Sequence, residues 1–249
     1  MAFLNNNNDV YASEAVKRAL AGNVDINALE ALKRANELTR SSYSTFTLAG
    51  MLVLTVIILS IVILSQLLGF ELSEFNQLDA TRSAIVDITL VLILSPLMAG
   101  LMMMGIAKAR NKTVQIGDLF KWISITVVLA LGSLLSSILF QLGLALLIVP
   151  GIYIGIASTF TLPLIADKQL TAVSALILSI RVVNVYFMQF LIFFLISMAL
   201  FLFAAFTFGL ALIWILPLYL NAKGVLYNQL FGDDEPETNS DVDNSVFNA

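Results

Sequence analysis

The stretch Thr45–Phe70, TFTLAGMLVLTVIILSIVILSQLLGF, contains no charged residue and is long enough to cross a membrane. A bilayer has a hydrocarbon core about 30 Å thick, which an α-helix spans with roughly 20 apolar residues. The runs are continuous rather than alternating, and backbone groups in lipid must be satisfied within the segment, so helices are expected. The sequence therefore predicts an all-α integral membrane protein with six transmembrane helices. After the first, the runs are Ala84–Ala107, Trp122–Gln141, Leu144–Ile165, Phe187–Phe206 and Phe208–Tyr227.

Basic residues are distributed unevenly between the loops that separate these runs. Arg82 lies on one side of the membrane in a six-span arrangement, and twelve lysines and arginines lie on the other. Because cytoplasmic loops carry an excess of Lys and Arg, this bias predicts that both ends of the chain are cytoplasmic. The twelve are Lys17, Arg18, Lys33, Arg34, Arg40, Lys108, Arg110, Lys112, Lys121, Lys168, Arg181 and Lys223.

The composition excludes several kinds of chemistry. Charged residues make up 12% of the chain, whereas a soluble domain has about a quarter. The sequence contains neither cysteine nor histidine, which removes thiolate nucleophiles, imidazole bases and the usual zinc or haem ligands. Walker and G-x-S-x-G motifs are also absent. We therefore expect a protein that is not an enzyme, with no catalytic residue, metal site or cofactor, and no nucleic-acid partner.

Three regions follow from the polarity of the chain. Residues 1–44 are predicted to form a cytoplasmic helical segment, residues 45–231 the six-helix transmembrane domain, and residues 232–249 an acidic tail. The tail is expected to be disordered because it has almost no large apolar residue to bury. Its acids are Asp233, Asp234, Glu235, Glu237, Asp241 and Asp243.

Two short helices are predicted before the first span. Ser13 can cap a helix that ends at Leu20, and Asp25 can cap a second helix over residues 26–39. The pair can form a soluble helical hairpin. Alternatively, the second helix lies flat on the membrane, with its apolar side formed by Ala28, Leu29, Leu32 and Ala35.

Similar segments precede the third and fifth spans, at Val114–Lys121 and Thr171–Tyr186. The pattern indicates three units, each a short or in-plane cytoplasmic helix followed by a transmembrane hairpin. The apolar face of the last of these helices is expected to be Ala172, Ala175, Leu176, Ser179, Val183 and Tyr186, with Arg181 and Asn184 on its polar side.

Pro150 and Gly151 interrupt the fourth run, and Gly155 completes a G-x-x-x-G pair with Gly151. A break here could present backbone groups to a ligand, as broken helices do in transporters. A packing kink satisfied by neighbouring helices is the alternative. Glycines at this spacing also allow close helix packing.

Asp87 is the acid that lies inside an apolar run. It is either an interfacial carboxylate close to Arg82 or a proton or cation site.

A set of basic residues is expected near the inner leaflet. Each basic side chain close to an anionic surface contributes about 1 kcal/mol of attraction. These residues could therefore hold phospholipid headgroups, or they could only fix orientation during insertion. They are Lys108, Arg110, Lys112, Lys121 and Arg181.

A longer stretch carries a family resemblance. The segment LALLIVPGIY at Leu144–Tyr153 leads to LPLIADK at Leu162–Lys168, and AVSAL follows at Ala172–Leu176. This order resembles the bacterial YciC-type inner-membrane family and the membrane domains attached to some glycerophosphodiester phosphodiesterases. The likeness covers roughly residues 143–227, without the tryptophan that the family typically has near Val182 or Val183. It implies a six-helix bacterial inner-membrane protein without assigned chemistry.

The function expected from the sequence is that of a non-enzymatic protein that organises the membrane or interacts with lipid. Its partners would be phospholipids of the anionic inner leaflet and either a second copy of the chain or another envelope protein. The alternative is a transporter or channel for a small solute or lipid that uses the broken fourth span. A cavity beside Pro150 would favour that alternative if it were lined by Ser133, Ser137, Ser158 or Asn184.

Overall fold

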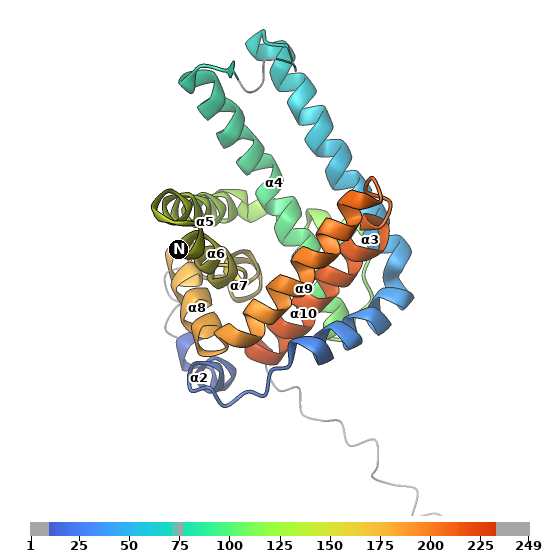
Figure 1. The fold of residues 1–249 in the computed structure, drawn as a ribbon, viewed down its shortest axis with the longest axis vertical. Helices are drawn as coiled ribbons and strands as arrows, with labels where there is room; N and C mark the ends of the chain where they lie inside the picture. Colours follow the sequence, from blue (N-terminus) through green and yellow to red (C-terminus); the bar gives the residue numbers. More distant parts are fainter. Residues whose placement is uncertain (1–9, 72, 74–76, 233–249) are drawn as a thin grey trace, which may run out of the picture.

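The computed structural model describes residues 10–71, 73 and 77–232 (Figure 1). All regular structure in this part of the chain is helical, which confirms the all-α prediction. The predictions for residues 1–9 and for the tail from residue 233 lie outside the described residues. The elements are α2 (Glu14–Leu20), α3 (Ala28–Leu68), α4 (Ala80–Ala109), the 3₁₀ turns η2 (Ile116–Phe120) and η3 (Ile123–Ile125), α5 (Thr126–Leu146), α6 (Ile148–Ala157), α7 (Thr161–Lys168), α8 (Ala172–Val185), α9 (Phe187–Phe206) and α10 (Leu212–Phe231).

Five helical stretches in the described residues are long and apolar enough to cross a membrane, namely Ala28–Leu68, Ala80–Ala109, Ile116–Leu146, Ile148–Lys168 and Phe187–Phe206. Their outer faces expose large apolar side chains such as Leu67, Val149 and Phe206. A water-soluble protein would bury such a surface. These features are those of a multi-pass membrane protein.

Helix α10 differs from these five because polar residues interrupt its apolar sequence, among them Asn221 and Lys223. It packs most extensively against α3 and α4 and also contacts α9 and α2 (Figure 1). Its second half is almost entirely buried, from Leu220 to Tyr227. The polar residues of this half of α10 therefore lie in the interior of the protein, where they contact other helices.

Two glycines allow α10 and α4 to approach closely. A Cβ atom at Gly224 would overlap the backbone of Gly105, and one at Gly105 would overlap the backbone of Leu220. Small residues at such crossings let helix backbones touch, which strengthens van der Waals contact within membranes.

The N-terminal segment follows the sequence prediction in part. Ser13 caps α2, and its side chain accepts a hydrogen bond from the Val16 N–H. The cap predicted at Asp25 is wrong, because Asn27 caps the next helix and accepts from the Leu29 and Glu30 N–H groups. That helix continues through the first apolar run, since residues 40–44 contain neither glycine nor proline. Figure 1 shows α3 changing direction between its blue and cyan parts.

The alternative in which this helix lies flat on the membrane does not fit two of the four residues named for its apolar side. Ala28 and Ala35 are buried within the protein, together with Ala31, while Leu29 is exposed. The segment is held to the rest of the protein by hydrogen bonds from the Val24 N–H to the Tyr186 hydroxyl (3.2 Å) and from the Ala28 N–H to Gln189 Oε1 (3.1 Å). Burial raises the pKa of the Tyr186 phenol.

The helix before α9 matches its predicted face. In α8, the side chains of Ala172, Ala175, Leu176, Ser179 and Val183 are buried, whereas Arg181 and Asn184 are exposed. The segment before the third apolar run contains the 3₁₀ turn η2 instead of an α-helix, and the 3₁₀ turn η3 lies at the start of that run.

Candidate ligand-binding site

A cavity of about 460 Å³ lies between α5, α6 and α7 on one side and α9 and α10 on the other, with Met102 of α4 at its edge. Its volume falls in the range of small-molecule sites, roughly 300–1,000 Å³. The apolar part of its wall comes mainly from α9, which contributes Phe190, Phe193, Phe194, Met198 and Phe201.

Six hydroxyl side chains form the polar part of the wall. Thr161 and Ser197 are buried, and the Thr161 hydroxyl donates to the Ser158 carbonyl at 2.9 Å. Ser133 accepts a hydrogen bond from Ser95 on α4 at 2.9 Å. The buried hydroxyl oxygen of Ser136 has no hydrogen-bond partner among the described residues, which is uncommon for a buried polar atom. The set is Ser133, Ser136, Ser158, Thr159, Thr161 and Ser197.

Lys223 of α10 brings a positive charge to the same cavity. The residue is 8% exposed, and its Nζ lies 5.1 Å from the centroid of the Tyr219 ring. Within the described residues, no carboxylate pairs with this ammonium group. A cation–π contact contributes about 0.5–2 kcal/mol, whereas removing a lysine charge from water costs more than that unless an opposite charge compensates it.

The ring of Tyr219 is fixed in place by α9. It stacks on Phe193 with ring centroids 5.8 Å apart and meets Phe201 edge-on at 5.4 Å. These contacts hold the ring beneath the Lys223 ammonium group, so the cation has a defined position on the cavity wall.

The fourth apolar run is broken next to this cavity. Helix α6 ends at Ala157 and α7 begins at Thr161, and Ser158 and Thr159 of the break line the cavity. The cause is Pro163, because a proline cannot donate to the carbonyl four residues earlier and its ring clashes with that carbonyl.

Ser179 of α8 satisfies the backbone at this break. Its hydroxyl accepts from the Phe160 N–H at 3.1 Å and donates to the Ala157 carbonyl at 2.7 Å. Both groups would otherwise lose their partners when the helix ends. The break is therefore a stable element of the fold.

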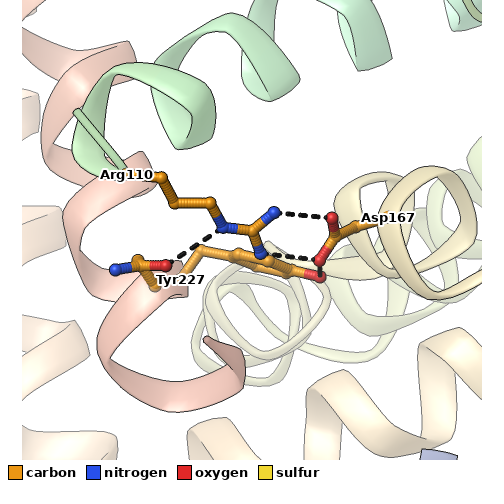
Figure 2. A network of polar contacts seen from close by, with 4 residues as sticks. Arg110, Asp167 and Tyr227 are labelled. Carbon is orange, nitrogen blue, oxygen red and sulfur yellow. Dashed lines mark hydrogen bonds and ion pairs between the residues drawn. The ribbon is translucent and has the colours of Figure 1, made fainter. Parts of the chain in front are cut away.

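A polar network joins three helix ends on the cytoplasmic side predicted from the sequence (Figure 2). Arg110, which caps α4, donates two hydrogen bonds to the Asp167 carboxylate of α7 at 2.9 and 2.8 Å. The Tyr227 hydroxyl of α10 donates to the same carboxylate at 2.9 Å. Arg110 also donates through Nε to the Asn228 side chain at 3.1 Å.

This network lies one helical turn of α10 from Lys223. The side chains of Arg110 and Asp167 are 23% and 12% exposed. An arginine that shares two parallel hydrogen bonds with a carboxylate is the kind of ion pair best tolerated away from water. The network ties α4, α7 and α10 together.

The position predicted for the helix break at Pro150 needs correction, because the chain is helical there. Pro150 lies in the first turn of α6, where its missing N–H needs no partner. The interruption instead separates α5, which ends at Leu146, from α6, which begins at Ile148. Gly151 packs against Gly143 and Leu144 of α5. Of the three residues predicted at this position, Gly155 is the one on the cavity wall.

Asp87 is exposed on α4 and does not line the cavity. Its expected neighbour Arg82 pairs with Asp79 at 3.4 Å.

The basic residues predicted to contact lipid are found in different settings. Arg110 is paired with Asp167, and Lys121 with Asp118 at 2.7 Å. The charge of Arg110 is therefore already paired within the protein, which corrects the prediction that Arg110 contacts a lipid headgroup. Lys112 and Arg181 are exposed, and Lys108 is half-buried.

No three of the acidic residues in the described part of the chain gather as metal ligands. No protein-family model, curated protein or solved structure matches the chain.

Proposed function

We propose that this chain is a non-enzymatic, multi-pass protein of the bacterial inner membrane that binds a membrane lipid within its helical domain. The observation that carries the proposal is the cavity beside α9. It combines a wall of phenylalanines with a group of hydroxyls, which matches the two parts of a lipid. The chain's resemblance to the YciC-type family supports the location.

Within this proposal α10 is a sixth span and both ends of the chain are cytoplasmic. The Lys and Arg bias supports this orientation, and the central packing of α10 explains how a helix containing Asn221 and Lys223 can lie at membrane depth. The three-hairpin arrangement then follows from pairing α3 with α4, α5 with α6 and α7, and α9 with α10.

Cysteine labelling tests the topology in a chain that has no cysteine of its own. Leu210, which is 73% exposed between α9 and α10, is expected to react as Leu210→Cys with an impermeant maleimide added outside the cell. Asn76→Cys in the first outer loop is expected to do the same, and Lys112→Cys only after the membrane is opened. Labelling of Leu210→Cys from the cytoplasmic side alone would contradict the proposal that α10 is a sixth span.

Filling the cavity tests lipid binding. Ser136→Phe is expected to reduce the lipid that remains with the purified protein by about tenfold, because the new ring occupies the space of the acyl chain. Native mass spectrometry in a neutral detergent measures the bound lipid. Ser137→Phe is the matched control, because Ser137 is exposed on the same helix and is not part of the cavity wall.

A smaller change, Ser136→Leu, provides a second variant if the phenylalanine disturbs folding. Equal lipid retention by the wild type, both Ser136 variants and Ser137→Phe would contradict binding in this cavity.

Transport of a solute or lipid is the second candidate function. Four residues were named above as ones that would favour transport if they lined a cavity. Two of them, Ser133 and Ser158, line this cavity. Ser137 and Asn184 are not, since Ser137 accepts from Gln141 and Asn184 from Tyr153. Lipid or solute flux in proteoliposomes that Ser136→Phe abolishes and Ser137→Phe preserves would favour transport over static binding.

A further inference from the structure

We infer that the ligand of this cavity is an acyl amphiphile whose head carries a single negative charge, and that Lys223 binds that head. The inference rests on the proposed function, which requires only that the cavity holds a lipid. It adds the chemical class of the headgroup.

The charge of the cavity points to an anion. Lys223 is nine-tenths buried and lines the cavity, and the contact that the structure gives its ammonium group is the face of Tyr219. The Asp167 carboxylate, which Tyr227 contacts one helical turn of α10 after Lys223, is already engaged, since it accepts from both Arg110 and Tyr227. The positive charge on the cavity wall therefore lacks a counter-ion from the described chain.

The hydroxyls specify an oxygen-rich head. A hydroxyl group can donate one hydrogen bond, and Ser136 has a buried hydroxyl without a partner. A phosphodiester or carboxylate accepts several hydrogen bonds and carries the negative charge that would serve as the counter-ion of Lys223. A zwitterionic head would bring its own ammonium group close to Lys223, and like charges at short distance repel.

The aromatic wall specifies the rest of the ligand. Phe190, Phe193 and Phe194 face the cavity from α9, and this surface would leave a small inorganic anion with most of the cavity unfilled. An acyl chain fills the apolar part and holds the head against Lys223. A lipid phosphodiester such as phosphatidylglycerol and a fatty-acid carboxylate share this chemistry.

The test uses the full chain purified in a neutral detergent, with binding measured by native mass spectrometry. The probes are phosphatidylglycerol, phosphatidylethanolamine with the same acyl chains, palmitate and inorganic phosphate. The wild type is expected to retain phosphatidylglycerol or palmitate at least about tenfold better than phosphatidylethanolamine. Whichever of the two is retained better identifies the source of the anionic head.

Two variants of Lys223 isolate its charge. Lys223→Met keeps the length of the side chain without the ammonium group, and it is expected to abolish the preference for the anionic lipid while phosphatidylethanolamine binding stays unchanged. Lys223→Arg keeps the charge and is expected to retain the preference. Lys33→Met is the control, because Lys33 is an exposed lysine that is not part of the cavity wall.

The outcomes separate this inference from the proposed function. If the wild type binds both phospholipids equally and Lys223→Met changes nothing, the anion inference fails and lipid binding stands. If Lys223→Met folds but loses both phospholipids equally, the lysine has a structural role and the inference also fails. Retention of inorganic phosphate as tight as that of phosphatidylglycerol would remove the acyl chain from the proposal. If the wild type retains none of the lipids, the proposed function itself fails.

Discussion

Replacing Gly224 with leucine is expected to prevent the protein from accumulating in a folded form. The Cβ atom alone would overlap the backbone of Gly105 and come within 2.7 Å of the Ile106 nitrogen. These are backbone atoms of α4, so no side-chain rotation can relieve the overlap, and α4 and α10 would have to separate. Even Gly224→Ala is expected to lower the free energy of unfolding by about 1–3 kcal/mol or more, as overpacking does elsewhere.

Fluorescence-detected size-exclusion chromatography and a thermal melt in detergent measure this effect. Gly105→Ala should behave like Gly224→Ala, because its Cβ would overlap the Leu220 carbonyl from the opposite side of the same crossing. Gly117→Ala is the control, since a Cβ there meets nothing within 4 Å. A melting temperature for Gly224→Ala equal to that of Gly117→Ala would show that the two helices do not cross this closely.

Replacing Asp167 with asparagine is expected to lower the free energy of unfolding by about 3 kcal/mol, the lower end of the range for breaking a buried ion pair. The lower end applies because Arg110 and Asp167 keep 23% and 12% of their side-chain exposure. Asparagine has nearly the same shape and can still accept from Tyr227. The decrease in the free energy of unfolding therefore measures the cost of leaving the Arg110 charge without its counter-ion.

A double-mutant cycle isolates the pair. Arg110→Gln combined with Asp167→Asn leaves no lone charge, so the double variant should be more stable than the sum of the two single losses predicts. Glu37→Gln is the matched control, because the Arg34–Glu37 pair is 51% and 67% exposed and such pairs contribute about 0–1 kcal/mol. Chemical denaturation in mixed micelles provides the free energies. A loss for Asp167→Asn no larger than that for Glu37→Gln would contradict the structural importance of the network.

Local patterns predicted much of the fold. The cap at Ser13 and the buried face of α8 follow from side-chain chemistry within a few residues, so one sequence suffices to find them. The prolines show where such reasoning failed. Pro150 and Pro163 each disrupt the helix about four residues before themselves, near Leu146 and Thr159. The break beside Ser158 and the cavity belongs to Pro163 and not to Pro150.

The candidate site was harder to predict because its residues come together only through the packing of distant helices. Lys223 entered the sequence interpretation as one more cytoplasmic charge. The signal that could have singled it out is its setting, a lysine in LNAKGVLY at Leu220–Tyr227 with apolar residues on both sides. Arg110 and Asp167 are 57 residues apart, and nothing in the local sequence of either predicts the other.

The position of α10 has a consequence for biosynthesis. The ribosome produces α3, α4 and α9 before α10, yet α10 is the helix against which α3 and α4 pack most extensively. Until α10 is made, Gly105 of α4 lacks the backbone that packs against it, and the Asp167 carboxylate accepts from Arg110 but not from Tyr227. A chain that ends before residue 212 is therefore expected to expose the surfaces of α3 and α4 that α10 covers in the full protein. Helix α10, whose polar residues make it the least suited to enter lipid alone, is made after the helices against which it packs.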